Sequence, residues 1–175
     1  MEKLISSEIV FTCPVFKVEK AVVELPDGTK AERWYAVKND AVGIVAINKA
    51  GEILLTREYR SASRDYRWRI PAGGLKDDES PEDGAHRELR EETGLDASRM
   101  QLLTVKKSPS GWIKQSSHFF LASDLFESPL DSGEHEDLEV VATNLDDVQN
   151  KIEKGDLTGN IAEGLRAAIE ILRST

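Results

Sequence analysis

The sequence predicts an α+β domain, and three observations support this prediction. Residues 7–38 alternate apolar and polar side chains in short bursts, which is typical of strands. Two short apolar runs follow at residues 41–47 and 52–56 and predict paired central strands. Helical signals appear at residues 80–94 and again from residue 144 onward. A chain of 175 residues suits one well-buried domain, so we expect a single domain over residues 1–175.

The first predicted element is an antiparallel hairpin of residues 16–25 and 29–37, because Pro26-Asp27-Gly28 forms a turn between them. Trp34 and Tyr35 lie near the end of its second strand. Aromatic faces stack on any nucleobase, so these two side chains are candidates for a substrate-stacking surface. The alternative is ordinary packing within the sheet or a dimer.

Cationic side chains follow the second apolar run, in the segment Arg57-Glu58-Tyr59-Arg60. A guanidinium at the end of a strand can bind a phosphate through two parallel hydrogen bonds, which makes Arg60 a candidate phosphate ligand. A surface salt bridge is the competing interpretation.

The next element is a helix that begins after Ser80 and ends at Gly94. Ser80 can accept hydrogen bonds from the amides of the first turn, Pro81 suits the first helical position, and Asp83 completes a reciprocal cap. Gly94 suits the left-handed residue that closes a helix.

Three carboxylates, those of Glu88, Glu91 and Glu92, share one face of this helix, because they are three and four residues apart. Like charges in this arrangement destabilise a helix, and a bound cation removes the conflict. Carboxylate oxygens suit hard ions such as magnesium, which is usually held by few carboxylates together with substrate phosphates. The alternative is a solvated acidic face with Arg87 and Arg90 interleaved.

The spacing of residues in this segment favours the metal-binding interpretation over a solvated acidic face. It fits the pattern G-x5-E-x7-R-E-U-x-E-E-x-G-U, where U is aliphatic, at Gly73, Glu79, Arg87, Glu88, Leu89, Glu91, Glu92, Gly94 and Leu95. The segment therefore resembles the Nudix hydrolase box, and agreement at nine positions is far more specific than a lone glycine motif.

The resemblance implies a Nudix fold, in which a mixed sheet lies between helices. It also implies metal-dependent hydrolysis of a nucleoside diphosphate linked to another group. By this resemblance Glu88, Glu91 and Glu92 are metal ligands and catalytic residues, and the carbonyl of Ala72 adds a ligand. Glu79 and Arg87 would brace the loop against the helix, with Gly73 and Gly94 as the fixed glycines of the motif.

The rest of the chain resembles the ADP-ribose pyrophosphatase branch of this family. In that branch an N-terminal sheet, here residues 1–38, precedes the catalytic core, here residues 39–175, and helps to form a swapped homodimer. The resemblance also favours Arg60 as a phosphate ligand. Pro109 matches a proline found a fixed distance beyond the box, although Ser-Pro-Ser-Gly stands here in place of Ser-Pro-Gly.

An acidic loop at residues 131–137 matches the Glu-x-Glu-Asp loop of the same branch. By that match Glu134 is the general base and Glu136 a further metal ligand, and Asp137 completes the motif. Most acidic, glycine-bearing loops are merely solvated, which is the alternative.

Arg69 departs from the family pattern, since related sequences commonly carry an acid just before the Pro-Ala-Gly segment. We expect Arg69, at the mouth of the site, to supply a phosphate or carboxylate contact. The remaining predicted elements are strands at 101–105, 118–122 and 138–143 and helices at 144–154 and 159–173, the last with an apolar stripe typical of core packing.

Charge and cysteine content narrow the class of protein. With 23 basic and 32 acidic residues the net charge is −9, which disfavours nucleic-acid and anionic membrane partners. Cys13, the single cysteine, cannot form an internal disulfide. Without a secretory signal or a bilayer-length apolar run, we expect a cytoplasmic protein.

The function that follows is Mg²⁺-dependent hydrolysis of a nucleoside diphosphate sugar, most simply ADP-ribose to AMP and ribose 5-phosphate, with Mn²⁺ as the alternative metal. The alternatives are a Nudix hydrolase of UDP-sugars, GDP-mannose or dinucleoside polyphosphates, and a nucleotide-binding module without catalysis. The intact acidic residues of the box disfavour the last of these.

Overall fold

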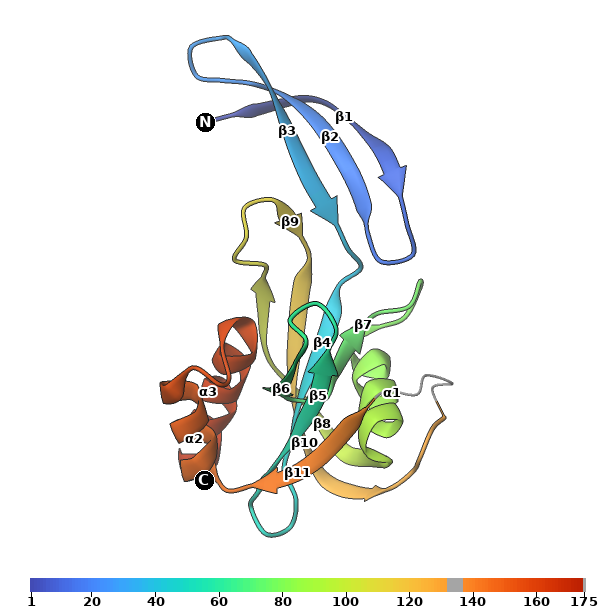
Figure 1. The fold of residues 1–175 in the computed structure, drawn as a ribbon, viewed down its shortest axis with the longest axis vertical. Coiled ribbons are helices and arrows are strands. Elements are labelled where there is room, and N and C mark those ends of the chain that lie inside the picture. The colour runs from blue at the N-terminus through green and yellow to red at the C-terminus, as the bar shows by residue number, and fades with distance from the viewer. Residues whose placement is uncertain (132–136, 175) are drawn as a thin grey trace. The chain divides into compact units, whose positions relative to one another are not determined.

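The computed structural model describes residues 1–131 and 137–174, which form two compact units (Figure 1). The first unit contains Met1–Asp40 with Lys107–Ser116, and the second contains Ala41–Lys106 with Ser117–Thr175. The predicted single domain, with a subregion at residues 1–38, stays a prediction.

The first unit is a sheet with the strand order β1-β2-β3-β9. Its strands are β1 (Lys3–Thr12), β2 (Lys17–Glu24), β3 (Lys30–Val37) and the short β9 (Ile113–Lys114). The predicted hairpin is confirmed, since β2 and β3 pair antiparallel around a turn in which the Leu25 amide donates to the carbonyl of Thr29 and the Gly28 amide donates to the carbonyl of Leu25. The outer strand β1 was not predicted as a separate element.

The second unit contains a mixed sheet with the order β7-β4-β10-β8. Its strands are β4 (Ala41–Ala46), β7 (Ala72–Gly74), β8 (Leu95–Lys107) and β10 (Ser116–Glu127). Strand β4 pairs antiparallel with β7 and parallel with β10. A further sheet has the order β11-β5-β6, from β5 (Ile53–Arg60), β6 (Asp65–Arg69) and β11 (Leu138–Thr143).

The predicted pairing of the strands at 41–47 and 52–56 is wrong. They are joined by the predicted polar turn at residues 48–51, but a single bridge between Ile47 and Ile53 is the only pairing recorded between them in the described chain. The reason is that β7 and β10 occupy both edges of β4. Strand β5 therefore pairs with β6 and β11 instead.

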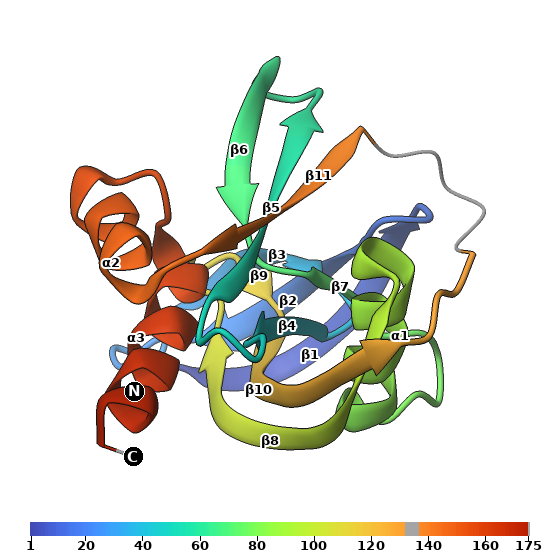
Figure 2. The ribbon, with the colours of Figure 1, turned by 90° about the horizontal axis from the view of Figure 1, so that it is seen from below.

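Three helices flank the mixed sheet, as the family resemblance implied: α1 (Pro81–Thr93) lies on one side, and α2 (Leu145–Lys154) and α3 (Gly159–Ser174) on the other (Figures 1 and 2). Strand β4 is apolar throughout because it is buried on both faces. Val42 and Ile44 pack in the cluster with Leu89 of α1, whereas Val45 packs with Leu165 of α3.

The predicted strands at 101–105 and 118–122 lie inside the longer β8 and β10, and the strand at 138–143 is confirmed. Both C-terminal helices are also confirmed, with Asn144 as the N-cap of α2. Across the part of the chain that the structure describes, no helix combines the length and the apolar character that a membrane crossing requires.

Candidate active site

The site is built on helix α1, whose ends follow the sequence signals. The hydroxyl of Ser80 accepts from the amide of Asp83 at 3.1 Å and donates to the Asp83 carboxylate at 2.6 Å. The reciprocal cap is therefore made through the Ser80 hydroxyl rather than its backbone amide. Gly94 closes the helix with φ of 73°, and its N–H donates to the carbonyl of Arg90.

The apolar stripe of α1 fixes which way its acidic face points. Ala85 and Leu89 are fully buried in the core, and full burial of a leucine side chain contributes about 1.5–3 kcal/mol. Glu88, next to Leu89, is carried to the edge of that core and is only 9% exposed. A carboxylate in this position must have charged or hydrogen-bonding partners.

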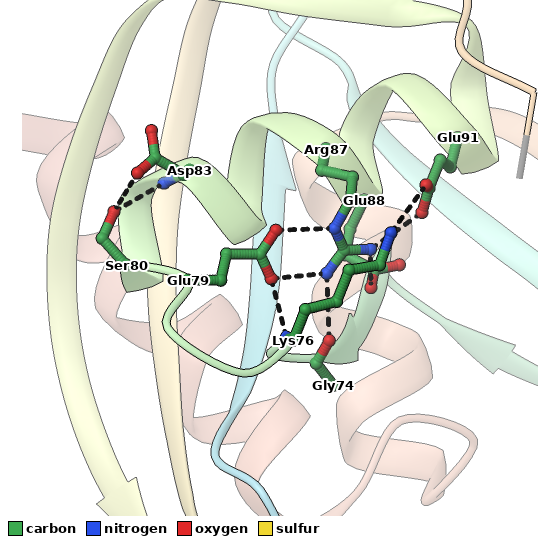
Figure 3. A network of polar contacts seen from close by, with 8 residues as sticks. All are labelled: Gly74, Lys76, Glu79, Ser80, Asp83, Arg87, Glu88 and Glu91. Carbon is green, nitrogen blue, oxygen red and sulfur yellow. Dashed lines mark hydrogen bonds and ion pairs between the residues drawn. The ribbon is translucent and has the colours of Figure 1, made fainter.

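Arg87 supplies those partners and joins the loop to the helix (Figure 3). Its guanidinium binds both oxygens of Glu79, at 2.7 and 2.8 Å, and donates to the carbonyl of Gly74 at 3.0 Å. Its Nη1 donates to Glu88 at 2.6 Å and to Glu91 at 2.8 Å. One guanidinium thus connects three carboxylates, two of which, Glu88 and Glu91, are among the three candidate metal ligands on α1.

The surroundings of Glu79 and Glu88 shift the pKa values of their carboxyl groups in opposite directions. Hydrogen bonding from Arg87 lowers the pKa of Glu79 to about 2. Burial raises the pKa of Glu88 above its ordinary value, although Arg87 opposes that shift. Glu79 is therefore a firmly ionised brace, whereas the ionised form of Glu88 is disfavoured by its buried position.

Gly73 makes room for the Glu88 carboxylate. A Cβ atom at this position would lie 2.0 Å from Oε1 and 2.1 Å from Cδ of Glu88, so only glycine allows the side chain to occupy its present place. At neighbouring Gly74 a Cβ would meet no atom within 4 Å. The glycine of the motif is thus required here by close approach, not by backbone conformation.

The third acidic residue of the face, Glu92, faces strand β7. Its Oε1 accepts from the amide of Ala72 at 3.2 Å. This contact brings the peptide at Ala72, whose carbonyl the sequence suggested as a metal ligand, next to the acidic face.

The carboxylate oxygens on this face of α1 are the type of ligand that suits a divalent cation. Glu88, Glu91 and Glu92 present hard oxygen donors within one helical turn, and oxygen donors are the ligands that magnesium prefers. As placed, the carboxylates turn toward Arg87 and the backbone: the described residues include no group of three acids, histidines or cysteines already gathered around a common point. Lys76 adds a solvent-exposed cation beside this face, with its Nζ 3.8 Å from Glu91.

The two candidate phosphate ligands, Arg60 and Arg69, are brought together by Glu58, for which the sequence predicted no role. Glu58 is 8% exposed and lies between them. Its Oε1 accepts from Arg60 and lies 2.6 Å from Nε of Arg69. The period of two along a strand, which puts Glu58 and Arg60 on one face of β5, is the signal that could have identified it.

The remaining substrate candidates belong to the first unit. Trp34 is 51% exposed, and Lys20 lies over its ring at 5.6 Å. Tyr35 is covered by Lys114 at 4.3 Å from its ring centroid. As neighbours on β3, Trp34 and Tyr35 project to opposite faces of the sheet, so one base cannot stack on both side chains of one chain. Pro109 is exposed in the segment before β9.

Glu134 and Glu136, the candidate base and the candidate further metal ligand, lie outside the described residues. Asp137, which follows them, is described. Its carbonyl accepts from the amide of Tyr59 at 3.3 Å, and its carboxylate accepts from the hydroxyl of Tyr66.

Comparison with known proteins shows which protein family the chain resembles. The NUDIX domain family model matches residues 37–160. The chain is 32% identical to an ADP-ribose pyrophosphatase of Bacillus subtilis (strain 168), over 87% of this chain and 83% of the relative. It is also 30% identical to a methanol dehydrogenase activator of Bacillus methanolicus, over 87% of this chain and 84% of that protein.

A solved structure gives the same result for the fold. The crystal structure of an ADP compounds hydrolase superposes with a TM-score of 0.87 at 25% identity, and the match covers 99% of this chain and 95% of that one. The predicted mixed sheet between helices is confirmed by this likeness.

Proposed function

The chain belongs to the Nudix family and is a hydrolase of diphosphate bonds, and from that premise we propose that its substrate is a nucleoside diphosphate sugar, most simply ADP-ribose, which it splits into AMP and ribose 5-phosphate. One observation carries this proposal. The acidic face of α1 and the arginines of β5 and β6 belong to the same unit, so carboxylates for a metal and guanidiniums for phosphates are available together.

Nudix hydrolases use divalent metals, and we propose Mg²⁺, with Mn²⁺ as the substitute. Glu88, Glu91 and Glu92 would hold it, together with the carbonyl of Ala72 and with Glu136. When bound, the metal supplies neutralisation of phosphate oxygens and a lower pKa for a bound water.

The residues of the chain provide the other parts of the reaction. Arg60 and Arg69 would bind the oxygens of the diphosphate, and Arg87 would keep Glu88 and Glu91 oriented. Glu134 would take the proton of the attacking water, a contribution of typically about 10² to 10⁴ in rate. Water is added across the P–O–P bond, so each product leaves with one phosphate.

The identity of the base and sugar rests on the relatives. The Bacillus subtilis relative is named an ADP-ribose pyrophosphatase and the solved neighbour an ADP compounds hydrolase. Stacking of the adenine would fall to Trp34 or Tyr35, and Pro109 would shape the substrate loop. Hydrolysis of UDP-sugars, GDP-mannose or dinucleoside polyphosphates by the same site is the second candidate.

We also propose a homodimer formed through the first unit. Every residue of the outer strand β1 is exposed, including the apolar side chains of Leu4, Ile9 and Phe11. An exposed edge strand that carries apolar side chains is a template for pairing with another chain.

The test is turnover of ADP-ribose beside UDP-glucose, GDP-mannose and diadenosine polyphosphates, with magnesium and then with a chelator, and with products identified by chromatography. A Glu92→Gln variant gives the background from contaminating enzymes. We expect magnesium-dependent AMP and ribose 5-phosphate, formed fastest from ADP-ribose. A faster reaction of another nucleotide would replace the substrate but keep the site, and no turnover of any would contradict the catalytic proposal.

A further inference from the structure

A buried carboxylate with two guanidinium partners lies on strand β5. Oε1 of Glu58 accepts from Nε of Arg60 at 2.9 Å and from its Nη2 at 2.5 Å. The same oxygen lies 2.6 Å from Nε of Arg69. The side chain of Glu58 is 11% exposed, whereas those of Arg60 and Arg69 are 45% and 32% exposed. The acid is thus at the base of the cluster, and both guanidiniums can be reached from solvent.

The strand register explains why these three side chains meet. Glu58 and Arg60 are two residues apart on β5 and therefore project from the same face of the sheet. Arg69 of the antiparallel neighbour β6 pairs with Thr56, which lies on that face too. The cluster is therefore held by two paired strands rather than by a loop.

The charges of the cluster do not balance. Two guanidiniums surround one carboxylate, which leaves a net charge of +1 in a chain whose total is −9. Burial and the neighbouring Arg60 lower the pKa of Arg69. One arginine would be enough to neutralise Glu58, so the second positive charge costs free energy in the protein alone.

Donor groups of both arginines remain available. Within residues 1–131 and 137–174, no group accepts a hydrogen bond from Nη1 of Arg60 or from either Nη atom of Arg69. A guanidinium with an open edge suits bidentate binding of phosphate oxygens. An anion would both use these donors and balance the charge.

A short segment of chain connects Arg69 with the acidic face of α1. Arg69 is three residues before Ala72, whose amide donates to Glu92, and the negative charge of Glu92, like that of Glu58, acts to raise the pKa of Arg69. The chain that follows Arg69 therefore leads to a residue in contact with the acidic face of α1.

We propose that Glu58 is a positioning residue: it holds Arg60 and Arg69 side by side as one binding element for the diphosphate of the substrate. This inference rests on the proposed function and deepens it. Glu58 touches neither substrate nor metal and acts only through the two guanidiniums.

The variant Glu58→Gln tests this, because glutamine keeps the size but loses the charge that orients both arginines. We expect KM for the best substrate to rise about tenfold while kcat stays within about twofold. Binding of ADP to the protein in the presence of a chelator, measured by calorimetry, should weaken by a similar factor. If the only effect of Glu58 were that its negative charge weakens the attraction of Arg60 and Arg69 for the anionic substrate, Glu58→Gln would lower KM instead.

Two comparisons separate positioning from mere stability. Glu139→Gln, which removes an exposed glutamate paired with Arg57 at 4.0 Å in the same sheet, should leave KM unchanged. In an Arg60→Gln, Arg69→Gln background, Glu58→Gln should change KM and ADP affinity by less than about twofold, because nothing remains to be positioned. A partly unfolded variant would lose apparent kcat at constant KM, which would contradict the proposal.

The outcome is separable from that of the proposed function. Absence of turnover in the wild-type protein contradicts the function, while the binding experiment with ADP still reports on Glu58. Normal turnover together with an unchanged KM and ADP affinity in Glu58→Gln overturns this inference alone. Failure of the wild-type protein to bind ADP overturns it as well.

Discussion

At the scale of single residues, Gly73 controls where the buried Glu88 carboxylate can lie. In Gly73→Ala the new methyl group would overlap that carboxylate, which would have to rotate away because it is the flexible end of its side chain. We expect the affinity for Mn²⁺, measured by electron paramagnetic resonance of the free ion, to fall by about 10- to 100-fold. The fold should survive, since the displaced group is not part of the apolar core.

The neighbouring glycine is the matched control for this experiment. A Cβ at Gly74 meets nothing within 4 Å, so Gly74→Ala should bind Mn²⁺ as the wild type does. Equal losses in the two variants would mean that loop flexibility, rather than space for Glu88, limits metal binding.

Substitution of Lys76 should strengthen metal binding, the opposite of the effect expected at Gly73. Its ammonium group lies 3.8 Å from Glu91 and is attracted to the acidic face that the divalent cation would use. Because the lysine side chain is 67% exposed, this competition is weak. In Lys76→Met we expect the dissociation constant for Mn²⁺ to decrease by about two- to fivefold.

Calorimetric titration with Mn²⁺ measures this change, and Lys49→Met is the control, since Lys49 is an exposed lysine in the turn between β4 and β5. If Lys76→Met bound the ion more weakly than the control, Lys76 would be supporting the site instead of competing for it.

Among these residues, the sequence predicted that three glutamates share one face of α1, but it did not predict the contact between Glu58 and Arg69. The spacing of Glu88, Glu91 and Glu92 required a shared helical face, because helix geometry is local. The role of Glu58 depends on Arg69, which is brought to it by the pairing of two strands. No local rule predicts that contact, since it requires the register of β5 and β6.

At the scale of elements, the bond between Glu79 and Arg87 fixes the loop before α1 to the helix, and its strength should depend on pH. The pKa of Glu79 is lowered from 4.5 to about 2 in the folded protein. A lowered pKa contributes stability that is fully present above the unfolded value and is lost as pH falls through the folded value. We therefore expect the contribution of this pair to be complete above about pH 4.5 and to decline toward pH 2.

Urea unfolding of wild type and Glu79→Gln at pH 7, 5, 4 and 3 measures this dependence. The variant should be less stable by about 1–3 kcal/mol at neutral pH, and the difference should shrink as the pH decreases. Glu170→Gln on the exposed side of α3 should stay within about 0.5 kcal/mol of wild type throughout. A difference for Glu79→Gln that is constant down to pH 3 would contradict the shifted pKa.

The elements themselves show which kind of sequence information is reliable. Helix α1 was predicted with both ends, because Ser80, Pro81 and Gly94 act within one turn of their positions. The partners of β4 and β5 were predicted wrongly, although both strands exist. Their apolar runs report burial on both faces, and burial does not specify which strand lies next to which.

At the scale of the whole molecule, the net charge of −9 opposes the approach of an anionic substrate. The cationic surplus at Arg60 and Arg69 and the proposed divalent cation counter this repulsion locally. Because acidic residues outnumber basic ones by nine, positive charge for an anionic substrate has to be supplied locally. Where that charge would be concentrated depended on the pairing of β5 with β6.

The proposed homodimer is the property of the whole molecule that can be tested most directly. Ile9 is 50% exposed on the outer strand β1, so Ile9→Lys would place a charge in a dimer interface formed by this edge. In a two-fold symmetric dimer the change occurs twice, and burial of an unpaired ammonium is unfavourable. We expect the dimer dissociation constant, measured by sedimentation equilibrium, to rise by about 100-fold or more. Leu102→Lys is the control, because Leu102 is also 50% exposed but lies on β8 of the second unit. If both variants sediment as the wild type does, β1 is not the interface, and a monomeric wild type would exclude the dimer altogether.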